Sequence, residues 1–442
     1  MVSAASGASK AFGSSCKGMI ETRPQKTQER ALLIGLEKEG VSKWDLQDSL
    51  EELRELANSA GAKVVDTVTQ KLQRPTAPYY IGRGKAESIK DSCQDQQVTS
   101  VIFDDELSPA QGRNLENLFA RKVLDRTQLI LDIFAQRARS REGRLQIELA
   151  QLQYLLPRLT RMWHHLSRQT GGIGTRGPGE TQLEVDRRRV QERIARLERE
   201  LEAVRKTRAI QRQGRKRHQW PVAAVVGYTN AGKSTLLNLL TGADLVAEDK
   251  LFATLDPTTR SFVLPNRQRV LLTDTVGFLR KLPHTLIESF KATLEEVSEA
   301  DLLIHIVDLS HPRVDEQMEA VDAVVKELDA FGKQTLIVFN KIDNLPNREL
   351  AESYVKRFPG SVAISARTGE GLNTLVQALE KALSSWRLRS RFRIPSNESA
   401  LIAEIHRVGH VLELKYEGND ALIVAHVPPH LEQKLADYAV RD

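Results

Sequence analysis

The clearest chemical signal in the sequence is a glycine-rich loop that could hold phosphate groups. An apolar strand-length run (222–226) precedes the loop, and a helix-forming run (235–240) follows it. Glycines let backbone N–H groups turn towards phosphate oxygens, and the start of the helix adds partial positive charge. In such a loop the lysine reaches the β- and γ-phosphates and the serine hydroxyl ligates Mg²⁺. The loop matches GxxxxGK[ST] and comprises Gly227, Tyr228, Thr229, Asn230, Ala231, Gly232, Lys233 and Ser234.

Three further segments follow in order, each at the end of an expected strand. The first, residues 274–277, can hold Mg²⁺ through its carboxylate and sense a γ-phosphate through its glycine N–H. The carboxylate of the second can accept two hydrogen bonds from guanine that adenine cannot offer, and backbone N–H groups of the third can face guanine O6. Since α/β sheets place ligands at the carboxyl ends of strands, the set predicts a GTPase domain that binds GTP and GDP. The segments are Asp274-Thr275-Val276-Gly277, Asn340-Lys341-Ile342-Asp343 and Ser365-Ala366-Arg367.

One position departs from the Ras-like pattern and bears on catalysis. Phe278 stands where a catalytic glutamine would follow the DxxG segment. A phenyl ring cannot orient a water molecule, so we assign no catalytic residue and expect slow intrinsic hydrolysis. An activating group supplied from outside is worth about 10³–10⁵ in rate.

Alternating α/β patterns predict the sheets that position these segments. We expect the GTPase domain over 219–388 and a separate N-terminal α/β domain over 28–127. Strand-length runs at 31–35, 63–67 and 99–103, with helical stretches at 50–59 and 109–122, favour a mostly parallel N-terminal sheet. Within it, Gly82 and Gly84 could form a phosphate-binding turn or a purely structural one.

Between these domains, residues 128–218 predict a long antiparallel helical hairpin. Leucines and other apolar residues recur every three or four positions on both arms, which is the pattern of helices that pack side by side. A glycine-rich stretch at 171–179 must form the tip, because no helix tolerates it. Arms of about 25 residues would carry the tip roughly 35–40 Å. His164 and His165 on the first arm have no partner in catalytic spacing, so we interpret them as surface or seam residues.

The excess positive charge of the chain lies in one middle segment, residues 121–218, which contains the predicted hairpin. Residues 121–218 carry 24 basic and 11 acidic side chains, whereas the whole 442-residue chain has a net charge of only +6. A localised basic excess is typical of a surface that binds nucleic acid; a solvated helix face is the other interpretation. Glycines around Arg176 favour recognition of RNA shape rather than reading of base pairs, and we expect no DNA specificity.

The motifs resemble those of the HflX GTPases, a family of the translation-factor-related class. The resemblance covers roughly residues 30–390. It rests on the phosphate loop, DTVGFLRKLP and NKID, on YIGRGK (80–85) and GGIGTRGPGETQLE (171–184), and on the segment Leu251, Phe252, Ala253, Thr254, Leu255 and Asp256. By resemblance, Phe252–Asp256 would bind GTP, Thr254 would ligate Mg²⁺ and Asn230 could ligate K⁺. A loop-compatible polar residue is the alternative for Asn230.

The resemblance also implies a ribosome-associated protein. HflX proteins bind the large ribosomal subunit and its RNA and split or rescue stalled ribosomes, and hydrolysis would drive release. The tip would reach towards the peptidyl transferase centre through Gly172, Gly174, Arg176, Gly177 and Gly179. An RNA-binding GTPase of ribosome assembly or RNA modification is the alternative. A nucleotide-gated protein-binding module is a third class, which the basic hairpin disfavours.

The remaining segments and the composition add broader expectations. Residues 1–27 predict a disordered tail, with an organelle import signal as the minority interpretation, and 389–442 predict a small α+β module. The two cysteines, Cys16 and Cys93, are too few for a disulfide framework, so Cys93 is interpreted as an inert thiol. No apolar stretch approaches the ~20 residues of a membrane span. We therefore expect a soluble, cytoplasmic monomer.

Overall fold

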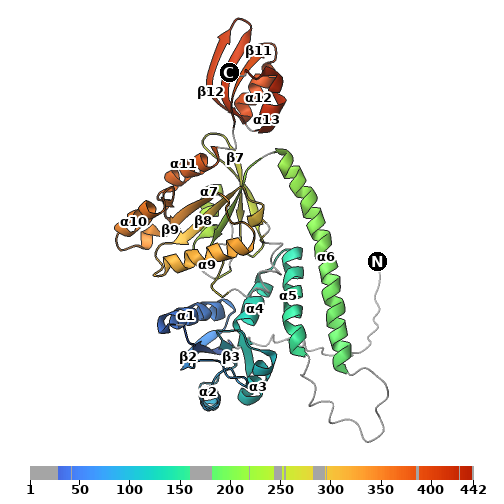
Figure 1. Cartoon of the computed structure of the whole chain (residues 1–442), viewed down its shortest axis with the longest axis vertical. Coiled ribbons are helices and arrows are strands. Elements are labelled where there is room, and N and C mark those ends of the chain that lie inside the picture. Colours follow the sequence, from blue (N-terminus) through green and yellow to red (C-terminus); the bar gives the residue numbers. More distant parts are fainter. Residues whose placement is uncertain are drawn as a thin grey trace, which may run out of the picture.

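The structure is a computed structural model of the chain. It describes residues 28–40, 42–159, 182–218, 220–242, 251–252, 255–281, 294, 296–384, 388–427 and 429–440. Three α/β units follow one another along the longest axis of the molecule (Figure 1). Among the described residues, no helix is long and apolar enough to cross a membrane.

Four parallel strands form the sheet of the N-terminal unit. Their order is β2 (Lys63–Lys71), β1 (Arg30–Glu37), β3 (Ser100–Phe103) and β4 (Lys122–Asp125). The parallel sheet predicted from the sequence is therefore confirmed. The helix predicted over 109–122 is too long, because α3 (Pro109–Phe119) ends where Ala120 adopts a left-handed φ of 49° and the chain then enters β4.

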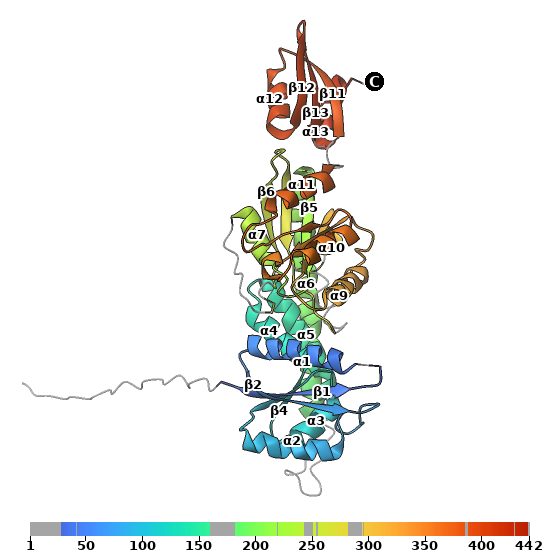
Figure 2. The ribbon, with the colours of Figure 1, turned by 90° about the vertical axis from the view of Figure 1, so that its left-hand side faces the viewer.

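Helices cover both faces of this sheet. Leu33 packs with α1 (Lys43–Ser59) and α4 (Arg126–Arg137), whereas its neighbours Leu32 and Ile34 pack with α2 (Arg83–Asp95) and α3. Figure 2 shows α1 and α2 on opposite sides of the strands. The apolar cluster around α1 and α4 continues into the middle unit, so these two helices lie between the two sheets. The domain boundary expected at 127/128 falls inside α4.

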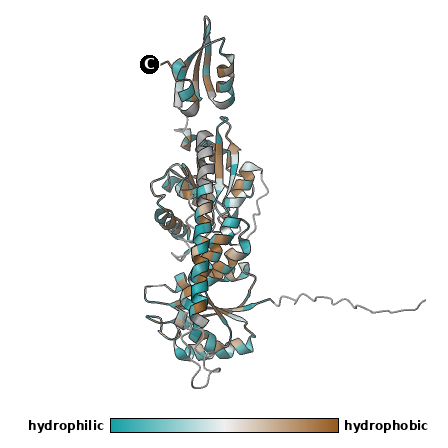
Figure 3. Cartoon of the chain, turned by 90° about the vertical axis from the view of Figure 1, so that its right-hand side faces the viewer, coloured by the Kyte–Doolittle hydropathy of each residue, from teal (hydrophilic) through white to brown (hydrophobic). Residues whose placement is uncertain are grey.

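Two helices form the arms of the hairpin. α5 (Arg141–Leu159) and the 37-residue α6 (Gln182–His218) run antiparallel, and α6 extends along both the N-terminal and the middle units (Figure 1). Arg193 of α6 makes a two-pronged ion pair with Glu148 of α5, at 2.7 and 2.9 Å. Much of α6 carries polar residues (Figure 3). The predicted apolar seam is confirmed by the cluster of Leu145, Leu149, Leu152, Ile194, Leu197 and Leu201.

The middle unit contains a six-stranded sheet. Its strand order is β10 (Val362–Ala363), β9 (Thr335–Asn340), β8 (Leu302–Asp308), β5 (Val222–Gly227), β7 (Arg269–Asp274) and β6 (Thr258–Val263). β6 pairs antiparallel with β7, and the other pairings are parallel. The described helices of this unit are α7 (Lys233–Thr241), α9 (Val314–Glu327), α10 (Glu349–Arg357) and α11 (Leu372–Ala382).

The C-terminal unit is a small α+β fold. An antiparallel sheet of β11 (Leu388–Pro395), β13 (Asp420–Val427) and β12 (His410–Glu417) packs with α12 (Ser399–Val408) and α13 (Pro429–Lys434). In the predicted α+β module, the helix-like stretch 399–406 forms α12 and the strand-like runs 411–416 and 421–427 form β12 and β13, whereas no such run predicts β11. Arg391 and Arg393 alternate there with the fully buried Phe392 and Ile394, so the segment lacks a continuous apolar run.

Candidate nucleotide site

The phosphate loop joins β5 to α7 in a conformation that its residue types permit. Gly227 and Gly232 have φ values of 155° and 95°, and Asn230 has a left-handed φ of 60°, which asparagine tolerates better than most residues. A Cβ atom on Gly227 would lie 2.3 Å from the Ile306 carbonyl oxygen on β8. The turn therefore requires glycine at this position. The conformation also accounts for Asn230 without a cation, so K⁺ binding there stays a prediction.

Lys233 occupies the centre of the loop. Its Nζ donates to the carbonyl oxygens of Gly227 at 3.1 Å and Tyr228 at 2.7 Å. Burial lowers the pKa of Lys233 to about 8, and Asp274 opposes part of that shift. The buried Thr229 hydroxyl has no hydrogen-bond partner in the described part of the chain. A buried cation and a buried hydroxyl beside backbone N–H groups fit a bound phosphate.

Ser234 and Asp274 supply oxygen atoms that fit Mg²⁺. The Ser234 Oγ donates to the Asp274 Oδ2 at 2.6 Å, so the start of α7 and the end of β7 meet at one point. Hydroxyl and carboxylate oxygens are the ligands that Mg²⁺ prefers. Bound there, the ion would neutralise charge on the β- and γ-phosphates.

The segment after β7 closes against the phosphate loop. A Cβ atom on Gly277 would lie 2.8 Å from the Thr229 Cα and 2.9 Å from the Lys233 Nζ, so the backbone passes directly beside the lysine. The Phe278 N–H donates to the Gly227 carbonyl at 3.1 Å, and the Thr229 N–H donates to the Phe278 carbonyl at 2.8 Å. The Phe278 ring is 2% exposed and lies in the apolar core. It has no polar atom with which to position water.

The expected guanine-binding segments meet at the ends of β9 and β10. Asn340 links two loops, because its Nδ2 donates to the Ala231 carbonyl at 2.8 Å and its Oδ1 accepts from the Ala366 N–H at 2.9 Å. A hydrogen bond from Ser365 and the neighbouring Arg367 hold the pKa of Asp343 below its usual range. The carboxylate is thus ionised and suited to accept hydrogen bonds from a base.

Ile342 and Lys341 complete this corner of the site. Lys341 adopts a left-handed φ of 63°, and its Nζ pairs with the Asp308 Oδ2 at 2.7 Å. Ile342 is buried in the core, and its N–H donates to the Ile364 carbonyl at 3.3 Å. Val276 is likewise buried, and the Thr275 hydroxyl donates to the Val225 carbonyl at 2.6 Å. These residues hold the loops in place.

The segment around 251–256 lies against the N-terminal unit. The Phe252 ring packs edge-on to Phe134 of α4, with centroids 4.5 Å apart. The Asp256 carboxylate accepts the N–H groups of Arg139 and Ser140 at 2.9 and 2.7 Å, ahead of α5. Leu255 is buried in the shared core. In this arrangement Phe252, Leu255 and Asp256 contact protein; their assignment to GTP binding stays a prediction.

Several expected functional residues lie outside the described residues. They are Ala253, Thr254, the histidines of the first arm, and the tip residues Gly172, Gly174, Arg176, Gly177 and Gly179. The same holds for residues 1–27.

Two further features of the N-terminal unit can be interpreted structurally. Gly82 precedes α2, and its N–H donates to the Gln70 Oε1 at 2.9 Å, which favours a structural turn over a phosphate site. Burial raises the pKa of the Cys93 thiol, in keeping with an inert group.

A polar junction that was not predicted from the sequence lies beside the phosphate loop. The Tyr228 hydroxyl donates to Glu52 of α1, and the Arg280 N–H donates to the same hydroxyl at 2.9 Å. The only sequence signal is a pair of cations, Arg280 and Lys281, directly after the DTVG segment. Their partners are far away in the chain and depend on how the two units pack.

Comparison with known proteins identifies the family. Three family models match consecutive parts of the chain: GTP-binding GTPase N-terminal over residues 47–135, GTP-binding GTPase Middle Region over 137–215, and 50S ribosome-binding GTPase over 222–341. GTPase HflX of Caldanaerobacter subterraneus is 47% identical over 94% of this chain and 95% of its own length.

Two other relatives agree with this match. GTPase HflX of Lacrimispora saccharolytica is 48% identical over 94% of this chain and 97% of its own length. GTPase HflX of Escherichia coli K12 is 47% identical over 82% of this chain and 85% of its own length. The long shared length and the assembled phosphate loop together show that the chain belongs to the HflX family of GTPases, which bind and hydrolyse GTP.

Proposed function

We propose that this GTPase binds the large ribosomal subunit in the cytoplasm and splits or rescues stalled ribosomes, with GTP hydrolysis driving its release. The observation that carries the proposal is the long basic hairpin attached to a GTPase unit. The 50S ribosome-binding description of the matched family model supports the same partner.

The hairpin has the charge and the reach that ribosomal RNA requires. Residues 128–218 carry 21 basic against 10 acidic side chains, and the 37 residues of α6 form a helix of about 55 Å. Arg188 and Arg189 are exposed on α6. Neutralising phosphates with such side chains releases counterions, which gives a strong and salt-sensitive affinity.

Cations complete the proposed GTPase site. Mg²⁺ would be held by Ser234 and Thr254, with Asp274 acting through water, and K⁺ by Asn230. Replacing K⁺ with Na⁺ should then slow single-turnover hydrolysis, while equal rates in the two salts would remove K⁺ from the proposal. Because Phe278 is buried and apolar, large ribosomal subunits should also accelerate hydrolysis strongly.

Co-sedimentation with purified large ribosomal subunits tests the proposal. The protein should pellet with the subunits in a non-hydrolysable GTP analogue and less so in GDP. Arg188→Gln together with Arg189→Gln should weaken the binding. Arg348→Gln together with Arg357→Gln is the matched control, since it removes two similarly exposed charges from the GTPase unit.

Two outcomes would count against the proposal. No pelleting with subunits in any nucleotide state would contradict it. Equal binding to free structured RNA and to intact subunits would favour the alternative, a GTPase of RNA modification or ribosome assembly.

A further inference from the structure

Tyr228 of the phosphate loop is joined to both units of the molecule. Its carbonyl oxygen accepts a hydrogen bond from the Lys233 Nζ at 2.7 Å. Its hydroxyl donates to Glu52 of α1 and accepts from the Arg280 N–H at 2.9 Å. Burial, followed by the Glu52 charge, raises the pKa of Tyr228, so the phenol stays protonated and able to donate. One residue therefore links the phosphate lysine, through its backbone carbonyl, to the segment after DTVG and the N-terminal unit, through its side-chain hydroxyl.

A buried arginine holds the N-terminal side of this junction. Arg126, at the start of α4, is 2% exposed. Its guanidinium pairs with Glu52 and with Asp104, the latter at 2.8 Å, and it also donates to the Arg280 carbonyl at 3.3 Å. The Asp104 carboxylate also pairs with the Lys281 Nζ at 2.5 Å. Because Arg126 and Asp104 are buried and paired with each other, movement of either one leaves a buried charge unsatisfied.

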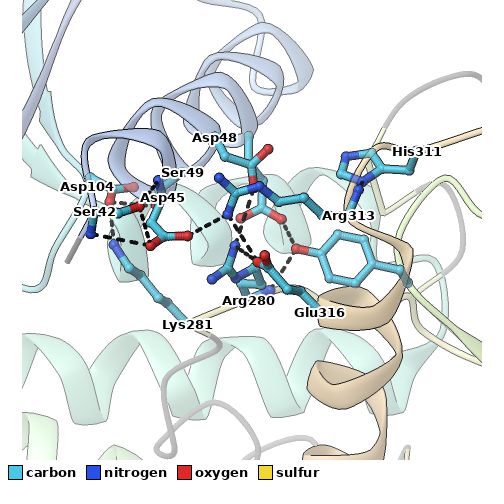
Figure 4. A network of polar contacts seen from close by, with 12 residues as sticks. Ser42, Asp45, Asp48, Ser49, Asp104, Arg280, Lys281, His311, Arg313 and Glu316 are labelled. Atoms are coloured by element: carbon cyan, nitrogen blue, oxygen red, sulfur yellow. Dashed lines mark hydrogen bonds and ion pairs between the residues drawn. The ribbon is translucent and has the colours of Figure 1, made fainter. Parts of the chain in front are cut away.

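Partly buried charges extend the junction along α1 (Figure 4). Arg280 pairs with Asp48 at 3.3 Å and with Glu316 of α9 at 2.9 Å. Arg313 pairs with Asp45 at 2.5 Å and with the same Glu316 at 3.0 Å. Acidic side chains of α1 thus face cations that follow the DTVG segment and β8. Opposite charges from two units meet where the nucleotide-sensing segment leaves the site.

We propose that Glu52 and Arg126 are positioning residues of the GTPase site, through which the N-terminal unit and the nucleotide state influence each other. The inference depends on GTP and GDP binding, not on the ribosome, so it can fail while the proposed function stands.

The connection follows from the hydrogen bonds of Tyr228. A bound phosphate competes with the Gly227 and Tyr228 carbonyl oxygens for the Lys233 Nζ, because an anion attracts the ammonium more strongly than a neutral carbonyl does. A γ-phosphate would also be recognised by the Gly277 N–H, three residues before Arg280. The first change acts on Tyr228, whose hydroxyl Glu52 holds, and the second acts on the segment that leads to Arg280, whose carbonyl oxygen Arg126 holds. Linkage then requires that the N-terminal unit alter the relative affinity for GTP and GDP in return.

The test uses the full-length chain with Glu52→Gln and a matched control, Glu51→Gln. Both changes remove one carboxylate from α1, but Glu51 pairs with Arg54 on the same helix, whereas Glu52 contacts Tyr228 and Arg126. Affinities for GDP and for a non-hydrolysable GTP analogue are measured by calorimetry. Glu52→Gln should change their ratio by about fivefold or more, the lower end of typical coupling, and Glu51→Gln should leave it unchanged.

Tyr228→Phe shows whether Glu52 acts through the tyrosine. If it does, the double variant Glu52→Gln/Tyr228→Phe should give the same ratio of GDP to GTP-analogue affinity as Tyr228→Phe alone, within about twofold. The proposal would be overturned if the two single changes altered the affinity ratio independently, so that their effects multiplied in the double variant. It would also be overturned if Glu52→Gln gave the same affinity ratio as Glu51→Gln. If Glu52→Gln does not fold, Asp48→Asn breaks the partly buried pair with Arg280 and must shift the ratio by itself. An unchanged ratio in that variant would also overturn the proposal.

Discussion

Replacing Asp343 with asparagine should change which base the site accepts. The structure holds this carboxylate between Ser365 and Arg367, and its pKa lies below the usual range, so it is an anion at neutral pH. Guanine can offer it two donors, N1–H and the exocyclic amine. Asparagine would place an NH₂ group against one of these donors. Losing one hydrogen bond to a charged acceptor costs about 1.5–3 kcal/mol, and the other is weakened because the remaining amide oxygen is neutral, so GDP affinity should fall by at least roughly 10–10²-fold.

Xanthosine diphosphate provides the complementary ligand. Xanthine carries a carbonyl where guanine has the amine, so Asp343→Asn should bind it better than the wild type does. Calorimetric titration with both nucleotides measures the ratio of affinities. Asp315→Asn is the matched control, because Asp315 is an exposed carboxylate of α9 that pairs with Arg357. A wild-type ratio in Asp343→Asn would show that this carboxylate does not read the base.

Two further predictions concern pH. Burial lowers the pKa of Lys233 to about 8 and bound phosphates should raise it, so nucleotide binding should take up a proton above pH 8 and weaken as the pH rises. Calorimetry at pH 8.5 in two buffers of different ionisation enthalpy measures this uptake, and identical binding enthalpies would contradict it. Burial, and to a smaller extent Lys233, lowers the pKa of His305 to about 4 from 6.5. As the pH falls, the imidazole of His305 is protonated in the unfolded chain before it is protonated in the folded chain. The free energy of unfolding should therefore fall by roughly 2 kcal/mol between pH 7 and pH 5. Urea unfolding should show a smaller fall for His305→Gln, and an equal fall would refute the assignment.

Local sequence rules recovered most of the nucleotide loops. The phosphate loop and the segments at 274–277 and 340–343 lie at the ends of β5, β7 and β9, where apolar runs predicted strands. The signal is strong because each depends on a few adjacent residues. Gly227 illustrates this, since its turn excludes any side chain.

Contacts between units could not be predicted in the same way. The Asp256 carboxylate accepts hydrogen bonds from residues 116 and 117 positions earlier in the chain, and Tyr228 and Glu52 are 176 positions apart. No local pattern encodes such pairs, because they depend on how two folded units pack. Strands β4 and β11 were missed for a simpler reason: neither has a continuous apolar run. β4 has only two apolar residues between Lys122 and Asp125, and β11 carries arginines between its buried positions.

Ribosome splitting tests the central claim most directly. Light scattering of intact ribosomes should fall when the protein is added with a non-hydrolysable GTP analogue, and fall much less with GDP. A protein lacking residues 172–179 should still bind nucleotide and retain salt-sensitive ribosome binding through α5 and α6, yet split ribosomes far more slowly. Scattering that stays constant with the intact protein in the GTP analogue would contradict the proposed function. Splitting at the full rate without residues 172–179 would show that the hairpin tip only connects the arms.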